Sequence, residues 1–189
     1  MTKMIGWIKI GDKVFPMRSL LQNFVYLLQA GFKSTSNANV VDTSNAVRTV
    51  GNYMISFYYG WWSSSGAAYP PAANDNYGIQ VGSNATAVTI TDYKLNTKIT
   101  HGVGAGQLKY SSQGMTGLYT SGSTRSFKVH RFFANDSGGD VTIREVGLCM
   151  YPGGAGGPFY TLISRDLTGD ITVTTGNAVP VEITIQITA

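Results

Sequence analysis

The chain has 189 residues, of which 43% are hydrophobic and 13% are charged. This length is enough for one well-buried core, or for one domain with an appendage, and the apolar content excludes a disordered chain. The low share of charged residues, together with 23 glycines and 11 tyrosines, is typical of a turn-rich all-β protein.

The positive charge of the chain lies in its N-terminal part. Residues 1–74 hold six basic and two acidic side chains, whereas eight of each sign balance from residue 75 onward. Because the six basic residues are dispersed, a solvated face is favoured over nucleic-acid binding. No stretch approaches the roughly 18 apolar residues that span a membrane, and Lys9 and Asp12 interrupt the first apolar run before a signal peptide forms. The single cysteine, Cys149, cannot form a disulfide within the chain, so we expect synthesis in a reducing cytoplasm.

A hairpin and one helix are predicted first. Residues 4–10 and 13–15 flank the turn Gly11-Asp12 and read as two short strands. The helix is predicted to run from Pro16, which suits a first turn, to Gly31, a residue common just after a helix end. Its apolar residues have the helical spacing i, i+1, i+4, i+7 and i+8. They are Leu20, Leu21, Phe24, Leu27 and Leu28.

Two alternatives remain open for this helix. It can cover one face or the open end of the β-structure of its own chain, because a short amphipathic helix needs a surface to pack on. It can also form, with the hairpin, an arm that docks on a neighbouring subunit, since assemblies often exchange such elements.

An aromatic segment follows a polar linker. Residues 33–45 are rich in Ser, Thr and Asn, with at most a short strand near 40–42, and residues 50–62 hold most of the aromatic side chains of this region. Adjacent aromatic residues point to opposite faces of a strand, so some of them are predicted to meet another surface. A protein interface is favoured, with a glycan as the alternative partner. The candidate interface residues are those of the helical stripe together with Tyr58, Tyr59, Trp61 and Trp62.

Further strands are predicted after a loop at residues 63–75. Residues 77–81, 87–91 and 108–110 read as short strands between turns rich in Gly and Asn. We therefore expect residues 1–74 to form an assembly region with hairpin, helix and aromatic strand, and residues 75–189 to form a β-sandwich domain.

The last third of the chain has the clearest strand pattern. In residues 181–188 every odd position is aliphatic and every even position is polar, as expected for a half-buried strand. Residues 126–133 alternate too, although Arg131 interrupts their apolar face, and a turn cluster at 135–140 predicts a hairpin with residues 141–150. The apolar phase of that second strand changes at Arg144-Glu145, which indicates a β-bulge or a change of sheet.

Three segments of this region carry a resemblance. They are residues 77–82 (YGIQVG), 162–166 (LISRD) and 133–148 (FANDSGGDVTIREVGL). Together with a final pair of alternating strands from 171 to 188, they resemble a group of small virion proteins of tailed bacteriophages. The resemblance covers residues 74–189 and implies a jelly-roll-like β-sandwich that serves as a building block of the virus particle. It implies no catalytic residue.

No pattern of reactive residues competes with that interpretation. The glycines at 102–106 lack the Lys and Ser/Thr of a phosphate-binding loop, and His101 and His130 stand apart from any metal-ligand set. Asp136 and Asp140 flank a turn with too few carboxylates for calcium. We therefore expect a non-enzymatic, all-β virion protein without cofactor, metal or membrane. It is predicted to be capsid-associated or decorating, to act by protein–protein assembly, and to contact copies of itself and other virion proteins. A tail or neck component and a glycan-binding adhesion module are the alternatives.

Overall fold

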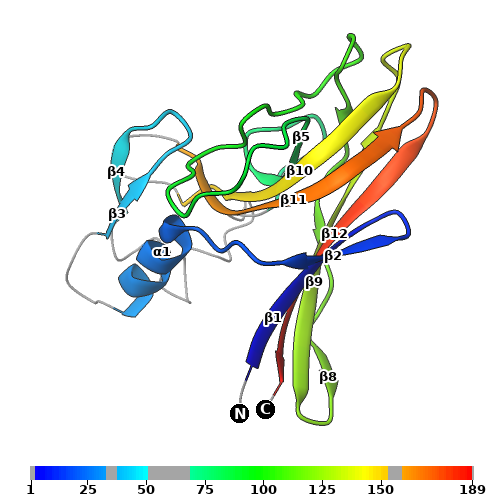
Figure 1. The fold of residues 1–189 in the computed structure, drawn as a ribbon. Helices are drawn as coiled ribbons and strands as arrows, with labels where there is room; N and C mark the ends of the chain where they lie inside the picture. The colour runs from blue at the N-terminus through cyan, green and yellow to red at the C-terminus, as the bar shows by residue number, and fades with distance from the viewer. Residues whose placement is uncertain (1–2, 33–37, 51–68, 153–158, 189) are drawn as a thin grey trace.

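The computed structural model describes residues 3–32, 38–50, 69–152 and 159–188. The chain is mainly β, with one helix in these residues, so the prediction of an all-β protein with an N-terminal helix is confirmed at this level. The strands of the described ranges form sheets of seven, three and two strands (Figure 1). In chain order the elements are β1 (Lys3–Ile10), β2 (Lys13–Met17), α1 (Gln22–Phe32), β3 (Ala38–Val41), β4 (Val47–Val50), β5 (Gly78–Gly82), β6 (Lys109–Tyr110), β7 (Gly114–Met115), β8 (Tyr119–Ser121), β9 (Thr124–Ala134), β10 (Val141–Met150), β11 (Thr161–Val173) and β12 (Ala178–Thr188).

The largest sheet joins the two ends of the chain. Its order is β2-β1-β12-β9-β6, and β7 and β8 also pair with β9. The predicted N-terminal hairpin is present, and its first strand pairs with β12 from Lys3↔Thr188 to Ile10↔Val181. The hairpin expected in a separate region, 1–74, is therefore integral to the same sheet as the C-terminal strands.

The smaller sheet, in the order β11-β10-β5, lies over one half of the largest sheet. One buried apolar cluster contains residues of both sheets, including Ile8, Phe133 and Ile183 from the seven-stranded sheet and Ile79 and Ile143 from the three-stranded sheet. The aliphatic positions predicted to face inward at Val181 and Ile183 are fully buried, so alternation identified the core face of this strand correctly.

The turn after β9 does not make the predicted hairpin. β9 pairs with β12 and β10 pairs with β11, so residues 135–140 cross from one sheet to the other, and residues 174–177 cross back. The last two strands, β11 and β12, likewise lie in different sheets. The two crossings are tied together by Asn135, whose Nδ2 donates to the carbonyl oxygens of Val173 and Gly139 at 2.6 and 2.8 Å. Asn, Asp, Ser and Gly suit a hairpin turn and a connection between two sheets equally well. The residue types of the turn therefore could not distinguish the two connections.

An irregularity is present where the apolar phase of β10 changes, but its extra residues lie in β11 and not, as predicted, in β10. Ile143 and Glu145 are two residues apart, whereas their partners Ile171 and Leu167 are four residues apart. From Glu145 to Met150 every residue of β10 is buried, so both faces of the strand are covered there and the alternation ends. The predicted strand at 87–91, in contrast, is wrong. Asp92 accepts hydrogen bonds there from the backbone N–H and the hydroxyl of Thr89, which gives a turn and leaves the Ile90 side chain exposed.

The helix packs on its own chain. Leu21 and Leu27 are buried, and α1 contacts β3 and β11. The buried amide of Asn23 donates to the carbonyl oxygens of Val41 and Leu162 at 2.9 and 3.2 Å and accepts from the Val41 N–H at 3.0 Å. Among the described residues, these contacts show the helix packed on the β-structure of its own chain, which is the first of the two alternatives.

The predicted ends of the helix were wrong. α1 begins at Gln22 and still includes Gly31. Pro16 lies in β2, opposite Trp7, on the outermost strand of the seven-stranded sheet. A proline is tolerated on an edge strand because its missing N–H faces away from the sheet, so the same residue fits a strand here as well as a first helical turn.

The β3–β4 hairpin gives a pH-dependent prediction. Burial alone would raise the pKa of Asp42, but hydrogen bonds from Ser44, Arg48 and the backbone N–H of Ala46 outweigh it and lower the pKa to about 2. Because the folded pKa is depressed, this stabilisation is present above the unfolded pKa of about 4 and is lost as the pH falls toward 2. We expect Asp42→Asn to cost about 2 kcal/mol at pH 7 and little at pH 2. Urea unfolding of both proteins across that pH range measures the difference, and a pH-independent loss would contradict the role of the charge.

Candidate assembly surface

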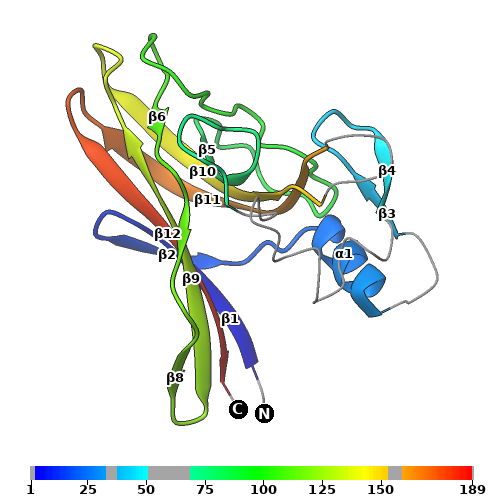
Figure 2. The same ribbon diagram turned by 180° about the vertical axis from the view of Figure 1, so that it is seen from behind.

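One half of the seven-stranded sheet extends beyond the three-stranded sheet. Figures 1 and 2 show this half, formed by parts of β1, β12, β9 and β8, projecting from the body of the molecule with both chain termini at its end. The core face of β12 continues onto it, since Ile185 and Ile187 follow the buried Ile183 at alternate positions. Ile187 is 47% exposed and Met115, on β7 opposite Val129, is 45% exposed. The sheet therefore carries its apolar pattern past the region that the second sheet covers.

An apolar groove lies where β2 ends beside β1. Its volume is about 690 Å³. Residues of β1, β2, β12 and the segment before α1 line it: Ile5, Gly6, Trp7, Val14, Pro16, Met17, Arg18, Leu20 and Ile185. Gly6 leaves little room for a side chain, because a Cβ there would lie 2.8 Å from the sulfur of Met17 and 3.3 Å from the carbonyl oxygen of Thr184.

The groove runs along a partly free strand edge. β2 pairs with β1 only from Gly6 to Ile10, so residues 3–5 of β1 have no strand partner on that side within the described chain. Unpaired backbone groups on a strand edge are a ready template for another strand. The apolar side chains of the groove thus lie beside the unpaired backbone edge of β1.

One cation lies at the groove. The side chain of Arg18 is exposed, while its backbone N–H donates to the Oδ1 of Asp166 at 2.9 Å. Asp166 is itself buried, and this burial raises the pKa of its carboxyl group. The bond fixes the segment between β2 and α1 onto β11, so Arg18 and Leu20 are held at the rim. Tryptophan, methionine and arginine beside aliphatic residues are the composition of a protein interface.

The structure distributes the predicted interface residues differently. Leu21 and Leu27 are buried within the chain, Phe24 packs against the same core, and Leu28 is exposed. Leu20 lies before the helix, forms a bridge with Ser164 and lines the groove. The remaining candidates, Tyr58, Tyr59, Trp61 and Trp62, lie outside the described residues.

The groove residues of β1 and β2 were missed as a site. Trp7 and Val14 occur in the predicted hairpin and Pro16 directly after it, and no local pattern indicates where the second strand stops relative to the first. One signal was present: in residues 4–10 apolar side chains occupy both faces of the strand, with Ile5 and Trp7 alternating with Ile8 and Ile10. A strand that is apolar on both faces meets two surfaces.

No reactive constellation accompanies the groove. Among the described residues, no group of three or more His, Cys, Asp and Glu side chains is placed to hold a metal ion. Burial raises the pKa of the Cys149 thiol to about 12, which removes it as a nucleophile at neutral pH. The helix in the described part of the chain is too short to cross a membrane.

Comparison of the chain with protein-family models, with curated proteins and with solved structures found no match in any of the three.

Proposed function

We propose that this chain is a non-enzymatic structural protein of a tailed-phage virion, a capsid-associated or decorating subunit that assembles through the groove between β1 and β2. The groove carries the proposal, because it combines an apolar lining, an arginine at the rim and an open strand edge in one place. Such a surface suits a lasting protein contact, and its lining offers no acid, base or nucleophile for a reaction.

The phage part of the proposal is supported by the three resembling segments. Residues 77–82 contain β5, residues 162–166 lie in β11, and residues 133–148 supply most of β10. These three strands are neighbours in the sheet β11-β10-β5. The three segments therefore supply strands of one sheet, while the final strand pair of the resemblance, residues 171–188, also includes β12 of the seven-stranded sheet.

The jelly-roll classification belongs to the same proposal. β9 pairs with β12 and β10 pairs with β11, so the inner pair is nested between the strands of the outer pair and lies in the other sheet. Nested antiparallel pairs that are shared between two sheets are the construction of a jelly roll.

The test is the oligomeric state of the purified chain. We expect multi-angle light scattering to show a closed homo-oligomer, and we expect Val14→Asp to yield monomers with an unchanged circular dichroism spectrum. Val14 is 61% exposed, so the substitution leaves the core intact while it replaces an apolar side chain of the contact with a charged one.

Val103→Asp is the matched control. Val103 is 58% exposed and lies in the loop before β6, away from the groove residues, so this variant should assemble normally. A wild-type chain that stays monomeric, or an oligomer that tolerates Val14→Asp as well as Val103→Asp, would rule out assembly through the groove.

A further inference from the structure

A second, polar pocket lies near the start of β5. Its volume is about 200 Å³. Its lining includes two lysines, two side-chain amides, a tyrosine and a leucine: Lys94, Lys98, Asn76, Gln80, Tyr160 and Leu95. Hydrogen-bond donors therefore dominate a cavity that also has an aromatic ring and an apolar residue.

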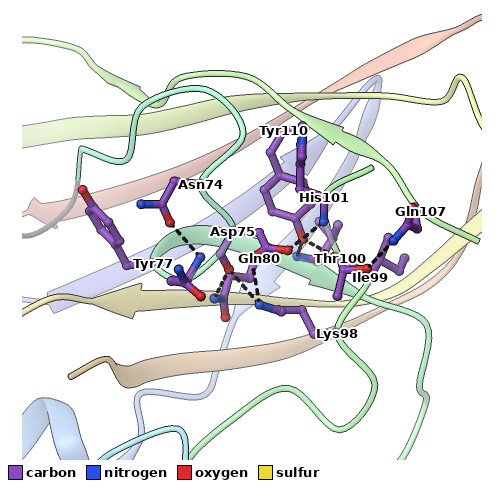
Figure 3. Close-up of polar contacts among 12 residues, drawn as sticks. Asn74, Asp75, Tyr77, Gln80, Lys98, Ile99, Thr100, His101, Gln107 and Tyr110 are labelled. Carbon is purple, nitrogen blue, oxygen red and sulfur yellow. Dashed lines mark hydrogen bonds and ion pairs between the residues drawn. The ribbon is translucent and has the colours of Figure 1, made fainter. Parts of the chain in front are cut away.

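Two polar side chains of this pocket, those of Lys98 and Gln80, are held in place by Asp75. Lys98 Nζ donates to the Asp75 carbonyl oxygen at 3.0 Å and to its Oδ1 at 3.1 Å, and the buried Gln80 donates from Nε2 to the same carbonyl oxygen at 2.7 Å. Figure 3 shows these side chains converging on Asp75. Because these bonds fix Lys98 and Gln80, two of the donors are arranged before any ligand arrives, which lowers the entropic cost of binding.

The pocket has an excess of positive charge. The Asp75 carboxylate is already used on both oxygens, since Oδ1 receives Lys98 and Oδ2 accepts the His101 backbone N–H at 2.7 Å. Lys94 is exposed, and its Nζ lies 5.6 Å from the centre of the Tyr93 ring with no carboxylate beside it among the described ion pairs. One ammonium group therefore remains to pair with an anion from solution.

The aromatic wall limits which anion fits. The ring of Tyr160 stacks on that of Tyr77 with centroids 5.9 Å apart and planes at 7°, and burial raises the pKa of Tyr160, so its hydroxyl stays protonated at neutral pH. The lining contains an aromatic ring and amides that both donate and accept, which suit a ring bearing hydroxyl groups. An inorganic phosphate ion would make no contact that needs the aromatic ring or the hydrogen-bond-accepting side of the amides. No arginine fork is present in the described lining, although arginine is the preferred partner of phosphate groups.

We propose that this pocket binds a carboxylate-bearing sugar unit, such as a uronic acid, of an acidic glycan, with Lys94 pairing with the carboxylate and Gln80, Asn76 and Tyr160 contacting the hydroxyl groups. This adds a glycan-binding site to the chain and does not depend on the assembly role of the groove.

The test is titration of the intact chain with methyl β-glucuronide, methyl β-glucoside and inorganic phosphate, followed by NMR or calorimetry. We expect the glucuronide to bind about tenfold more tightly than the neutral glucoside, as one charge-assisted hydrogen bond would give. Lys94→Ala should remove that difference. Lys109→Ala is the control, because Lys109 is also exposed but pairs with Asp136 away from the pocket.

Each of the other outcomes would overturn the proposal. Equal binding of the glucuronide and the glucoside would remove the role of the charge, and binding of phosphate alone would make the pocket a simple anion site. Absence of binding by all three probes, with the wild-type fold intact, would show that the pocket has no saccharide role. None of these binding measurements depends on the oligomeric state of the chain, so the glycan proposal and the assembly proposal can fail independently.

Discussion

Replacing Arg165 by methionine is expected to destabilise the fold by about 3–5 kcal/mol, because the change leaves a buried carboxylate without its cation. The Arg165 side chain is fully buried, and its Nε donates to Glu145 Oε2 at 2.6 Å, where Glu145 is also fully buried. Its Nη1 donates to Asp92 Oδ2 at 2.7 Å. A loss of this size removes much of the stability of a typical domain.

The arginine also organises a loop that has little regular structure. Its Nη2 donates to the carbonyl oxygen of Thr86 at 2.9 Å, while Glu145 accepts the backbone N–H of Thr97 at 3.0 Å. The pair therefore links β10 and β11 to residues 86–97. Lysine is a single-point donor and cannot reach these partners together, so we expect Arg165→Lys to recover only part of the loss.

Arg144→Met is the matched control for this prediction. Arg144 lies in β10, next to Glu145, and pairs with Asp170, but that pair is exposed to solvent. Exposed pairs contribute little because water screens them, so the control should unfold at the same denaturant concentration as the wild type. Urea unfolding monitored by circular dichroism measures both variants. Equal, small losses would show that Arg165 and Glu145 are not a stabilising pair.

Replacing Arg131 by methionine is the second large effect, with an expected loss of about 3 kcal/mol or more, since several buried acceptors lose a charged donor at once. The Arg131 side chain lies on the core face of β9 and is fully buried. It donates to five backbone carbonyl oxygens, at distances between 2.5 and 3.4 Å: those of Ser111, Tyr77, Ile79, Pro71 and Asn74.

The ring of Tyr110 provides the remaining contact, with the guanidinium carbon 4.7 Å from its centre. Burial lowers the pKa of Arg131 to about 10, so the group stays charged at neutral pH. Backbone carbonyl oxygens and an aromatic face thus replace the carboxylate that a buried arginine usually has. This side chain ties the loop before β5 to β9.

Arg125→Met separates this role from the general effect of losing an arginine. Arg125 lies on the same face of β9, is exposed, and within the described ranges its side chain donates to carbonyl oxygens near its own turn, those of Gly122 and Thr124. We expect hydrogen exchange to speed up in residues 70–80 of Arg131→Met and to remain unchanged there in Arg125→Met. Similar exchange in the two variants would contradict the proposed role of Arg131.

The candidate surfaces could be predicted only in part. The sequence identified the helical stripe as an interface, but two of its leucines are core residues and Leu28 is exposed. The groove depends on where β2 stops beside β1, and the polar pocket gathers residues 43, 76–80, 94–98 and 160. Sites built from segments this distant in the chain have no local pattern, because their residues become neighbours only through folding.

Arg131 illustrates the same limit. In the sequence it interrupted an apolar face, and nothing indicated a partner, since all five of its acceptors are backbone oxygens that every residue possesses. Arg144 and Glu145 are adjacent in the sequence, yet each pairs with a different residue of β11, Asp170 and Arg165.

The sequence by itself determined the local features of this protein: the β1–β2 hairpin, the position of the irregularity at Arg144-Glu145 and the buried face of β12. Each of these depends on the alternation of side chains along an extended chain, which is a property of neighbouring residues. Only the tertiary structure decided which sheet each strand joins, because crossings and hairpins use the same turn residues. The choice between a crossing and a hairpin depends on how much apolar surface distant strands bury together. This buried area is defined only when the two sheets pack against each other.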